Sequence, residues 1–280
     1  MQLTVTEDME SYQEALGTLA LDGKTVALVP TMGALHAGHM GLIQAASELA
    51  DAVAVSIFVN PKQFGPNEDF AKYPRMLERD LELLDEAGVA IAYTPSVEDL
   101  YQDGFSTIVS PGSIGAILEG HFRPGFFDGV ATVVTKLLLR TLPHVAVFGE
   151  KDYQQLCVIR RIASDLDIAV DIIGLPTVRE ADGLAMSSRN AYLSPEQRAV
   201  APKLYEALQR IRHTISSGAP INEAIAEGIA ALTQVGFKVD YLELRETDTL
   251  EVMETLDGEA RLLAAAWLGA TRLIDNIAVG

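Results

Sequence analysis

Two histidines stand close together where an apolar segment gives way to a helical pattern. His36 and His39 flank Gly38 in the sequence His-Ala-Gly-His. Imidazole N–H groups at the start of a helix can donate hydrogen bonds to phosphate oxygens while negative charge develops on them. The unpaired backbone N–H groups and the dipole of that helix end also favour an anion. The pattern therefore predicts a site for phosphate.

Other interpretations of these residues compete with a phosphate site. Gly33 and Gly38 have the spacing of a P-loop, but His39 and Met40 stand where that motif requires Lys and Ser or Thr. A zinc pair would need further ligands, and the chain has only five histidines. Two surface histidines are the remaining alternative. The strand–loop–helix setting, with glycines that let the backbone approach a ligand, favours phosphate.

A lysine follows a second apolar segment, in the sequence Gly149-Glu150-Lys151-Asp152. The Lys151 ammonium can stabilise negative charge on a phosphate in a transition state, and Asp152 can orient that ammonium or contact a ribose. A capping turn, with Glu150 and Asp152 in the first turn of a helix, is the alternative interpretation. Both interpretations can hold for the same residues.

Hydroxyl and guanidinium groups gather further along the chain, in Met186-Ser187-Ser188-Arg189. An arginine suits the charge of a triphosphate, and serine hydroxyls supply hydrogen bonds to its oxygens. An ordinary turn rich in Ser and Asn is the alternative, and we would prefer it if the segment stood alone.

Short apolar segments alternate with helical patterns over residues 1–176. Apolar strands that alternate with helices indicate a doubly wound α/β domain around a parallel sheet. Both the histidine and the lysine segments follow strands, so they lie at strand carboxyl ends, where such sheets bind ligands. We predict strands at 25–30, 52–59, 89–93, 145–148 and 169–173, and helices at 38–50, 75–87, 128–142 and 151–165.

The pattern changes after Leu175-Pro176, where we place a domain boundary. Helices followed by strands indicate a smaller α+β domain with an antiparallel sheet, over residues 177–280. The alternation of apolar residues in its first strand is imperfect. We predict helices at 195–217 and 221–234, and strands at 238–245, 260–268 and 271–279.

Composition excludes several classes of function. The net charge is -18, which argues against broad nucleic-acid binding but not against a locally basic phosphate pocket. No apolar run approaches the ~20 residues that span a bilayer. The stretch Met1–Asp8 lacks the basic and apolar regions of a secretion signal, so we expect a cytoplasmic protein without membrane contact. The single cysteine, Cys157, predicts a packed thiol and no intrachain disulfide.

Four segments together resemble one family. The string Pro30–His39, with the segments 58–64, 148–155 and 186–190, is similar to the pantothenate synthetase family, and the segments occur in the order found there. His-x-Gly-His also resembles the signature of the wider adenylyl-transferring superfamily, which includes class I aminoacyl-tRNA synthetases. One departure is Phe126, where the family often has His. Nearby, Arg123 is interpreted as an anion contact or a salt-bridge partner.

The resemblance implies an ATP-dependent ligase that condenses D-pantoate with β-alanine through pantoyl adenylate, releasing AMP and pyrophosphate, in vitamin B5 and coenzyme A biosynthesis. It implies a Rossmann-like domain over residues 1–176 that binds ATP and pantoate, and a lid domain over 177–280 that excludes water from the adenylate. It also implies a homodimer, to which the apolar stretch 131–139 can contribute. Mg²⁺ would shield the phosphates; for Asp69, Asp80 and Asp85, we prefer surface charge to a role as magnesium ligands.

The same resemblance implies roles for single residues. His39 is the catalytic proton donor, assisted by His36, and Lys151 is the third catalytic residue. Gln63 and Gln155 contact pantoate and β-alanine, since an amide offers both donors and acceptors, and Pro30 with Met32 forms an apolar wall. The residues implied in ATP binding are Met32, Gly33, His36, Gly38, His39, Gly149, Glu150, Lys151, Asp152, Val178, Met186, Ser187, Ser188 and Arg189.

Two rival functions use similar phosphate-binding residues. A nucleotidyltransferase that makes a stable nucleotide product would need no amine acceptor, and the segments around Gln63 and Gln155 argue against it. A regulatory module that binds a nucleotide without catalysis is the second rival. The presence of His36, His39, Lys151 and Arg189 argues against a decayed site.

Overall fold

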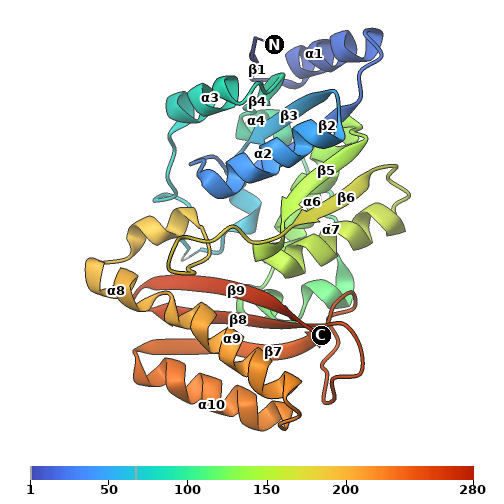
Figure 1. Ribbon diagram of the computed structural model, residues 1–280. Coiled ribbons are helices and arrows are strands. Elements are labelled where there is room, and N and C mark those ends of the chain that lie inside the picture. The colour runs from blue at the N-terminus through green and yellow to red at the C-terminus, as the bar shows by residue number, and fades with distance from the viewer. Residues whose placement is uncertain (1, 67) are drawn as a thin grey trace. The chain divides into compact units, whose positions relative to one another are not determined.

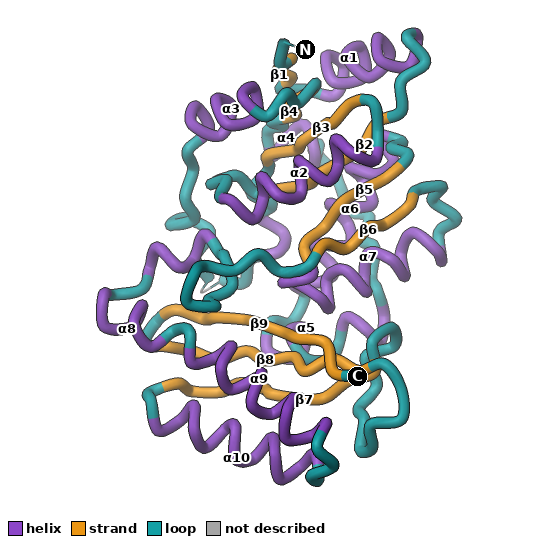
Figure 2. Tube along the Cα trace, in the orientation of Figure 1, coloured by secondary structure: helices purple, strands orange, loops and turns teal. Residues whose placement is uncertain are grey.

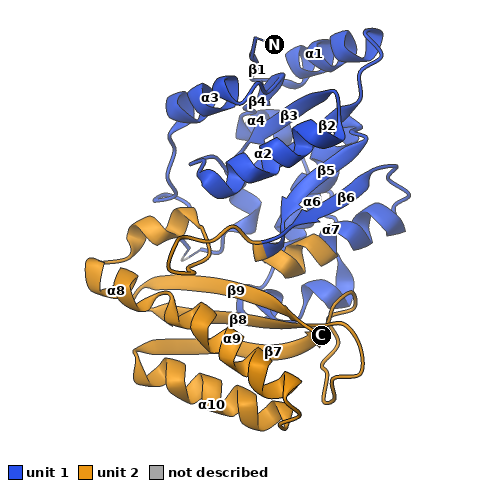
Figure 3. Ribbon diagram, viewed as in Figure 1, with its two compact units in different colours: residues 1–150, 158–176 blue, residues 151–157, 177–280 orange. Residues whose placement is uncertain are grey.

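The computed structural model describes residues 2–66 and 68–280 as two compact units (Figure 3). Unit 1 comprises residues 1–150 and 158–176, and unit 2 comprises residues 151–157 and 177–280. Met1, part of the stretch that we analysed for a secretion signal, lies outside the described residues.

The sheet of unit 1 has six parallel strands in the order β1-β4-β3-β2-β5-β6 (Figure 1). The chain proceeds from β2 outward through β3 to β4, and then returns to place β5 on the other side of β2. The strand order therefore reverses between β2 and β5, at the point where such sheets bind ligands. The strands are β1 (Thr4–Thr6), β2 (Val26–Thr31), β3 (Ala52–Ile57), β4 (Ile91–Tyr93), β5 (Val145–Gly149) and β6 (Asp171–Leu175).

Both faces of this sheet are buried, as its continuous runs of apolar residues predict. Val29 and Val147 pack with Ile43 of α2 and Leu84 of α3 on one face. Leu28 points to the other face, because side chains alternate along a strand, and it is also fully buried. The helices of this unit are α1 (Met9–Leu21), α2 (Ala37–Leu49), α3 (Leu77–Glu86), α4 (Val97–Leu100), α5 (Glu119–Phe122) and α6 (Phe126–Thr141), and α7 (Tyr153–Asp165) has residues in both units.

Unit 2 is a three-stranded antiparallel sheet with helices packed against it (Figure 2). Its core joins Leu208 and Ile211 of α9 and Leu232 of α10 to Leu262 of β8 and Leu273 of β9. The predicted class, a doubly wound parallel sheet with a smaller α+β unit, is thus confirmed. The elements are α8 (Pro195–Val200), α9 (Lys203–Ser216), α10 (Ile221–Gln234), β7 (Phe237–Glu246), β8 (Ala260–Leu268) and β9 (Thr271–Val279).

Three local features differ from the sequence predictions. Strand β1 and helices α1, α4 and α5 were not predicted. The predicted helix 195–217 is divided at Pro202, which has no N–H to donate to the preceding turn and is the N-cap of α9. The register of β7 shifts between Val239 and Tyr241, so that Tyr241 and Leu242 are both buried. This bulge explains the imperfect alternation in that segment.

The single cysteine behaves as a packed thiol, as predicted. Cys157 is buried and reduced, and its Sγ lies 3.6 Å from the backbone oxygen of Thr247, within unit 2. Of the helices in the described part of the chain, none is long and apolar enough to cross a membrane.

A largely buried ion pair, with side chains 11% and 14% exposed, joins distant parts of unit 1. Arg140 of α6 donates to Asp99 of α4, with 2.5 Å between Nη1 and Oδ2, and Tyr93 donates its hydroxyl to the same oxygen. The backbone N–H of Met9 donates to Asp99 Oδ1 at 2.9 Å. Burial raises the pKa of Asp99, but the hydrogen bonds from Tyr93, Arg140 and Met9 outweigh it and hold that pKa below its ordinary value.

Asp99→Asn should therefore lower the free energy of unfolding at neutral pH by about 3 kcal/mol, because it leaves the Arg140 charge without its buried partner. The depressed pKa means that the carboxylate's contribution is present above about pH 4 and is lost as the pH falls through the folded-state value. Urea titrations from pH 7 downward should show the difference from wild type shrinking below about pH 4.

Asp165→Asn is the matched control for this prediction. Its partner Arg161 lies 3.9 Å away and both side chains are more than half exposed, so the effect should stay within about 0.5 kcal/mol. Equal effects of the two substitutions would show that the buried pair has no special role.

Candidate active site

The turn that follows β2 is held by one buried carboxylate. Asp80 of α3, 1% exposed, accepts the backbone N–H groups of Ala34 and Leu35, both at 2.8 Å. Thr31 adds a second anchor: its hydroxyl donates to Ser56 O and accepts from Gly33 N at 3.2 Å. The expectation that Asp80 is a surface charge was therefore wrong, because the carboxylate exchanges water for backbone donors inside the fold.

Gly33 is required in this turn for two reasons. Its φ of +78° is a conformation that residues with a side chain rarely adopt. A Cβ at this position would also lie 3.0 Å from Asp80 Oδ2 and 3.1 Å from Ile57 Cγ2. The next residue, Ala34, also has a positive φ of 50°, a conformation that costs ~1 kcal/mol and is stabilised here by the hydrogen bond to Asp80.

The two histidines occupy the first turn of α2, directly after this turn. His36 is the N-cap, and its Nδ1 accepts the backbone N–H of Gly38 at 3.2 Å. His39 Nδ1 accepts the backbone N–H of His36 at 3.3 Å, and the two rings lie 4.0 Å apart. A ring nitrogen that accepts carries no proton, so each ring bears its N–H on Nε2. The pair therefore presents Nε2–H donors, as phosphate recognition requires.

The start of α2 is favourable to an anion. Residues 37–40, all in the described part of the chain, include no acidic side chain, so no carboxylate of the first turn itself competes with an anion there. Strand β5 ends at Gly149 beside β2 in the same sheet, so the predicted residues Gly149 and Glu150 lie at the reversal of strand order.

A second loop of unit 1, after β3, brings Gln63 to this region. Gln63 Nε2 lies 3.1 Å from the sulfur of Met32, in the turn that Asp80 holds. Asn60 fixes the glutamine amide, because its Nδ2 donates to Gln63 Oε1 at 3.1 Å and to Gly129 O at 3.1 Å. The hydroxyl of Tyr101 in turn donates to Asn60 Oδ1 at 2.8 Å. Two predicted residues, Met32 and Gln63, are thus neighbours, and predicted Pro30 is in the strand before them.

Asn60 was not among the predicted site residues. The side chain is 1% exposed and connects β3, the short helix at Pro61–Gln63 and α6. The available signal was an Asn-Pro pair directly after a buried strand, which indicates a turn but not a side chain that orients another amide. Gly129 permits the contact, since a Cβ there would lie 2.2 Å from Lys62 O.

Arg123 is a salt-bridge partner, one of its two predicted interpretations. Its Nε and Nη2 donate to the two oxygens of Glu68 at 2.7 and 2.6 Å. Its guanidinium also stacks 3.7 Å from the ring centre of Phe126. The phenylalanine that departs from the family pattern therefore packs on the arginine that holds the loop after β3.

The remaining predicted residues belong to unit 2. Lys151 lies in the short helix Glu150–Asp152 and its Nζ is 3.7 Å from Asp152 Oδ2, so Asp152 can orient the ammonium. Predicted Gln155 lies in the first turn of α7. Met186 donates its backbone N–H to Val178 O at 3.0 Å, which makes these two predicted residues neighbours in a hairpin.

The serine–arginine segment begins a short helix, Ser188–Tyr192, that Ser187 caps. The Ser187 hydroxyl accepts from the backbone N–H of Arg189 at 3.3 Å. Asn190 donates to Ala185 O at 3.1 Å and to Glu180 Oε1 at 2.9 Å, which closes the hairpin. The segment is thus a capped short helix beside a closed hairpin, and its role in phosphate binding stays a prediction.

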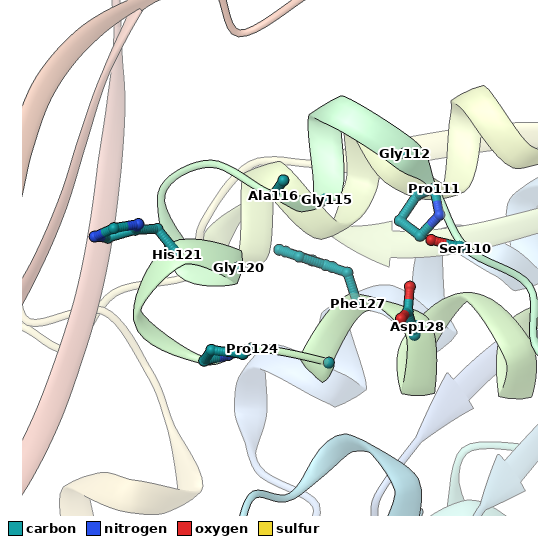
Figure 4. Close-up of a pocket in the computed structure, with 11 residues that line it drawn as sticks. Ser110, Pro111, Gly112, Gly115, Ala116, Gly120, His121, Pro124, Phe127 and Asp128 are labelled. Atoms are coloured by element: carbon teal, nitrogen blue, oxygen red, sulfur yellow. The ribbon is translucent and has the colours of Figure 1, made fainter.

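A cavity of about 410 Å³ opens elsewhere in unit 1, beside His121, Phe127 and Asp128 (Figure 4). None of the predicted site residues lines it, so we do not assign the phosphate site there. Among residues 2–66 and 68–280, no group of three or more His, Cys, Asp or Glu side chains is arranged to hold a metal ion.

Comparisons with known proteins agree over nearly the whole chain. A model of the pantoate-β-alanine ligase family matches residues 4–278. The pantothenate synthetase of Rhodospirillum rubrum is 55% identical over 279 residues, which cover 99% of each chain. That of Paramagnetospirillum magneticum is 54% identical over 276 residues, which cover 98% of this chain and 97% of the relative.

Solved structures give the same result. Pantothenate synthetase from Thermus thermophilus superposes with a TM-score of 0.92 at 46% identity, covering 98% of each chain. Pantoate-β-alanine ligase from Francisella tularensis, a complex with beta-gamma ATP and β-alanine, superposes with a TM-score of 0.83 at 36% identity. That match covers 98% of this chain and 97% of the other.

Gly33→Ala should lower the free energy of unfolding more than a glycine-to-alanine substitution that introduces backbone strain but no close contact. Gly23→Ala is the matched control, because Gly23 has a φ of +68° with no heavy atom within 4 Å of its would-be Cβ among the described residues. We expect a loss of about 1 kcal/mol for Gly23→Ala. For Gly33→Ala, which also crowds Asp80, we expect about 2–3 kcal/mol. Urea unfolding measures both; equal losses would mean that the close approach to Asp80 has no energetic effect.

Proposed function

The chain belongs to the pantoate-β-alanine ligase family, and from this premise we propose that it joins D-pantoate to β-alanine using ATP. In the first step, the pantoate carboxylate attacks the α-phosphorus of ATP and gives pantoyl adenylate and pyrophosphate. In the second, the amine of β-alanine attacks the acyl carbon and releases AMP. The observation that carries the proposal is the pair of Nε2–H donors at the start of α2, beside the strand reversal between β2 and β5.

The substrate supplies the nucleophile, so the protein needs only to position groups and to stabilise charge. We assign His39 as the proton donor to the phosphates, with His36 assisting, and Lys151 as the cation at the α-phosphate. Ser187, Ser188 and Arg189 also hold the phosphates of ATP. The residues that contact ATP also include Met32, Gly33, Gly38, Gly149, Glu150, Asp152, Val178 and Met186.

Gln63 is suited to a substrate oxygen. Its Oε1 is occupied by Asn60, so its Nε2 is the group directed toward Met32. A thioether sulfur is a weak acceptor, and a carboxylate or hydroxyl oxygen of pantoate would be a better partner for the same N–H. Gln155 serves the substrates in the same manner, and Pro30 with Met32 supplies the apolar wall.

Magnesium enters this proposal as part of the substrate. Mg²⁺ keeps several waters and is commonly held by nucleotide phosphates with one or two carboxylates. Both oxygens of Asp80 already accept backbone N–H groups, and the described residues form no metal cage. We therefore propose that MgATP binds as a unit. The Francisella relative in complex with beta-gamma ATP and β-alanine supports nucleotide and amine binding by this family.

Three further points are proposals. Residues 1–176 form the domain that binds ATP and pantoate, and residues 177–280 act as a lid that keeps water from the acyl adenylate. The protein is cytoplasmic. It is a homodimer, to which most of the stretch 131–139 offers little surface, since Ala131 and Leu138 are fully buried within the chain. Leu139 and Leu142, 56% and 71% exposed, remain available for a subunit contact.

Pyrophosphate release from MgATP and D-pantoate, followed by AMP release with and without β-alanine, tests the proposal. Wild type should release pyrophosphate only with pantoate, and should form pantothenate only with β-alanine. ATP binding without any response to pantoate would contradict the ligase and support a nucleotidyltransferase or a binding module.

His39→Ala and Lys151→Ala should each lower kcat for pantoate-dependent pyrophosphate release by about 10²–10³, because each removes a group that stabilises transition-state charge. Circular dichroism and thermal unfolding establish that the fold is retained. His213→Ala, at an exposed position of α9, is the histidine control and should keep wild-type activity. Near-normal adenylate formation by either site variant would remove its assigned role.

A further inference from the structure

The segment that carries Lys151 is anchored to the antiparallel sheet of unit 2. Asn276 of β9 donates its side-chain N–H to the backbone oxygen of Lys151 at 2.9 Å. Asn276 is 3% exposed, so this hydrogen bond is shielded from water. Residues 151–157 are grouped with unit 2 and not with the strand that precedes them.

The orientation of the Asn276 amide is fixed from its other end. Arg261 of β8 donates from Nη1 to Asn276 Oδ1 at 2.6 Å. A guanidinium can only donate, so the amide oxygen must face Arg261 and the amide nitrogen must face Lys151. Arg261 also stacks 3.7 Å from the ring centre of Tyr153, two residues beyond Lys151. The sheet therefore holds this segment through a backbone hydrogen bond and a ring contact.

The neighbouring residue of β9 holds the second phosphate segment. Asp275 pairs with both terminal nitrogens of Arg179, at 2.7 and 2.9 Å, and is 4% exposed. Arg179 also donates to Gly183 O at 3.1 Å and pairs through its backbone with Ala185, in the hairpin that leads to Ser187. Because consecutive side chains of a strand point to opposite faces, Asp275 and Asn276 hold these two segments from the two faces of β9.

We propose that Asn276 is a positioning residue for Lys151. Its amide and the adjacent Asp275 carboxylate each hold one segment, so that β9 sets the distance between Lys151 and the segment Ser187–Arg189. The inference rests on the proposed function, in which both segments contact ATP. A lysine ammonium sits on a flexible stem of four carbons, so its placement at the α-phosphate depends on where its backbone is held. Loss of the Asn276 hydrogen bond lets the Lys151 backbone shift, and a shift of the order of 1 Å is costly to catalysis.

Asn276→Asp tests this positioning role with nearly no change in shape. The carboxylate keeps an oxygen for Arg261 but replaces the donor to Lys151 O by a second acceptor. We expect kcat for pantoate-dependent pyrophosphate release to fall about tenfold or more. Asn276→Ser, which also lacks the amide donor, should show the same loss and provides a second variant if the aspartate does not fold.

Asp240→Asn is the matched control on the same sheet. Asp240 of β7 is a partly buried acceptor for Trp267 Nε1 at 3.0 Å and Arg272 Nε at 2.8 Å, and neither partner belongs to the proposed site. This substitution should lower the melting temperature but change kcat less than about twofold. The folded enzyme keeps Lys151 in place and therefore stabilises the transition state as wild type does.

The decisive readout is the combination with Lys151→Ala. If Asn276 acts through Lys151, Asn276→Asp should change the residual single-turnover rate of Lys151→Ala less than about twofold, because coupled residues are not additive. An equal fold-loss in both backgrounds, or a wild-type rate for a folded Asn276→Asp, would overturn the inference. Wild type without pantoate-dependent pyrophosphate release would instead overturn the proposed function, before any variant is compared.

Discussion

A buried carboxylate holds the turn on which the phosphate-binding end of α2 depends. Asp80 accepts two backbone N–H groups from residues that have no partner in the sheet, and one of them has a positive φ. The turn places His36 as the helix cap, and the cap fixes the ring of His39. Without this carboxylate, buried donors would be unsatisfied and the histidines would lose their common orientation. The imidazole pair is thus a consequence of a backbone constraint in the turn before it.

Unit 2 uses the same principle with different groups. There, a strand provides the fixed frame, and the side chains of Asp275 and Asn276 bind a guanidinium and a backbone carbonyl. In each unit, most groups assigned to ATP are only partly buried, whereas the side chains that hold their backbones are almost fully buried. The placement of the groups that contact ATP depends on the buried residues that hold their backbones. Those buried residues are therefore as important to the chemistry as the contacting groups.

The fold class was predictable because apolar strands and helical patterns alternate with clear periods, and the histidine, lysine and serine segments follow from residue type. Side chains that orient other residues were harder to find. Asp80 resembles any charge on an amphipathic helix, and Asn276 lies within an ordinary strand pattern. Their roles depend on a hydrogen bond to a residue far away in sequence, as in Asn276 to Lys151, and no local pattern records such a partner. The break at Pro202 was readable from the sequence, since proline lacks a backbone N–H.

Activation of the pantoate carboxylate as an acyl adenylate can be followed with pantoate labelled by ¹⁸O in its carboxylate. Attack of that oxygen on the α-phosphorus forms a C–O–P bridge, and attack of the amine on carbon then breaks the C–O bond. We predict that one ¹⁸O per turnover appears in AMP, measured by mass spectrometry. Label in inorganic phosphate with ADP as the co-product, or AMP without label, would contradict formation of an acyl adenylate.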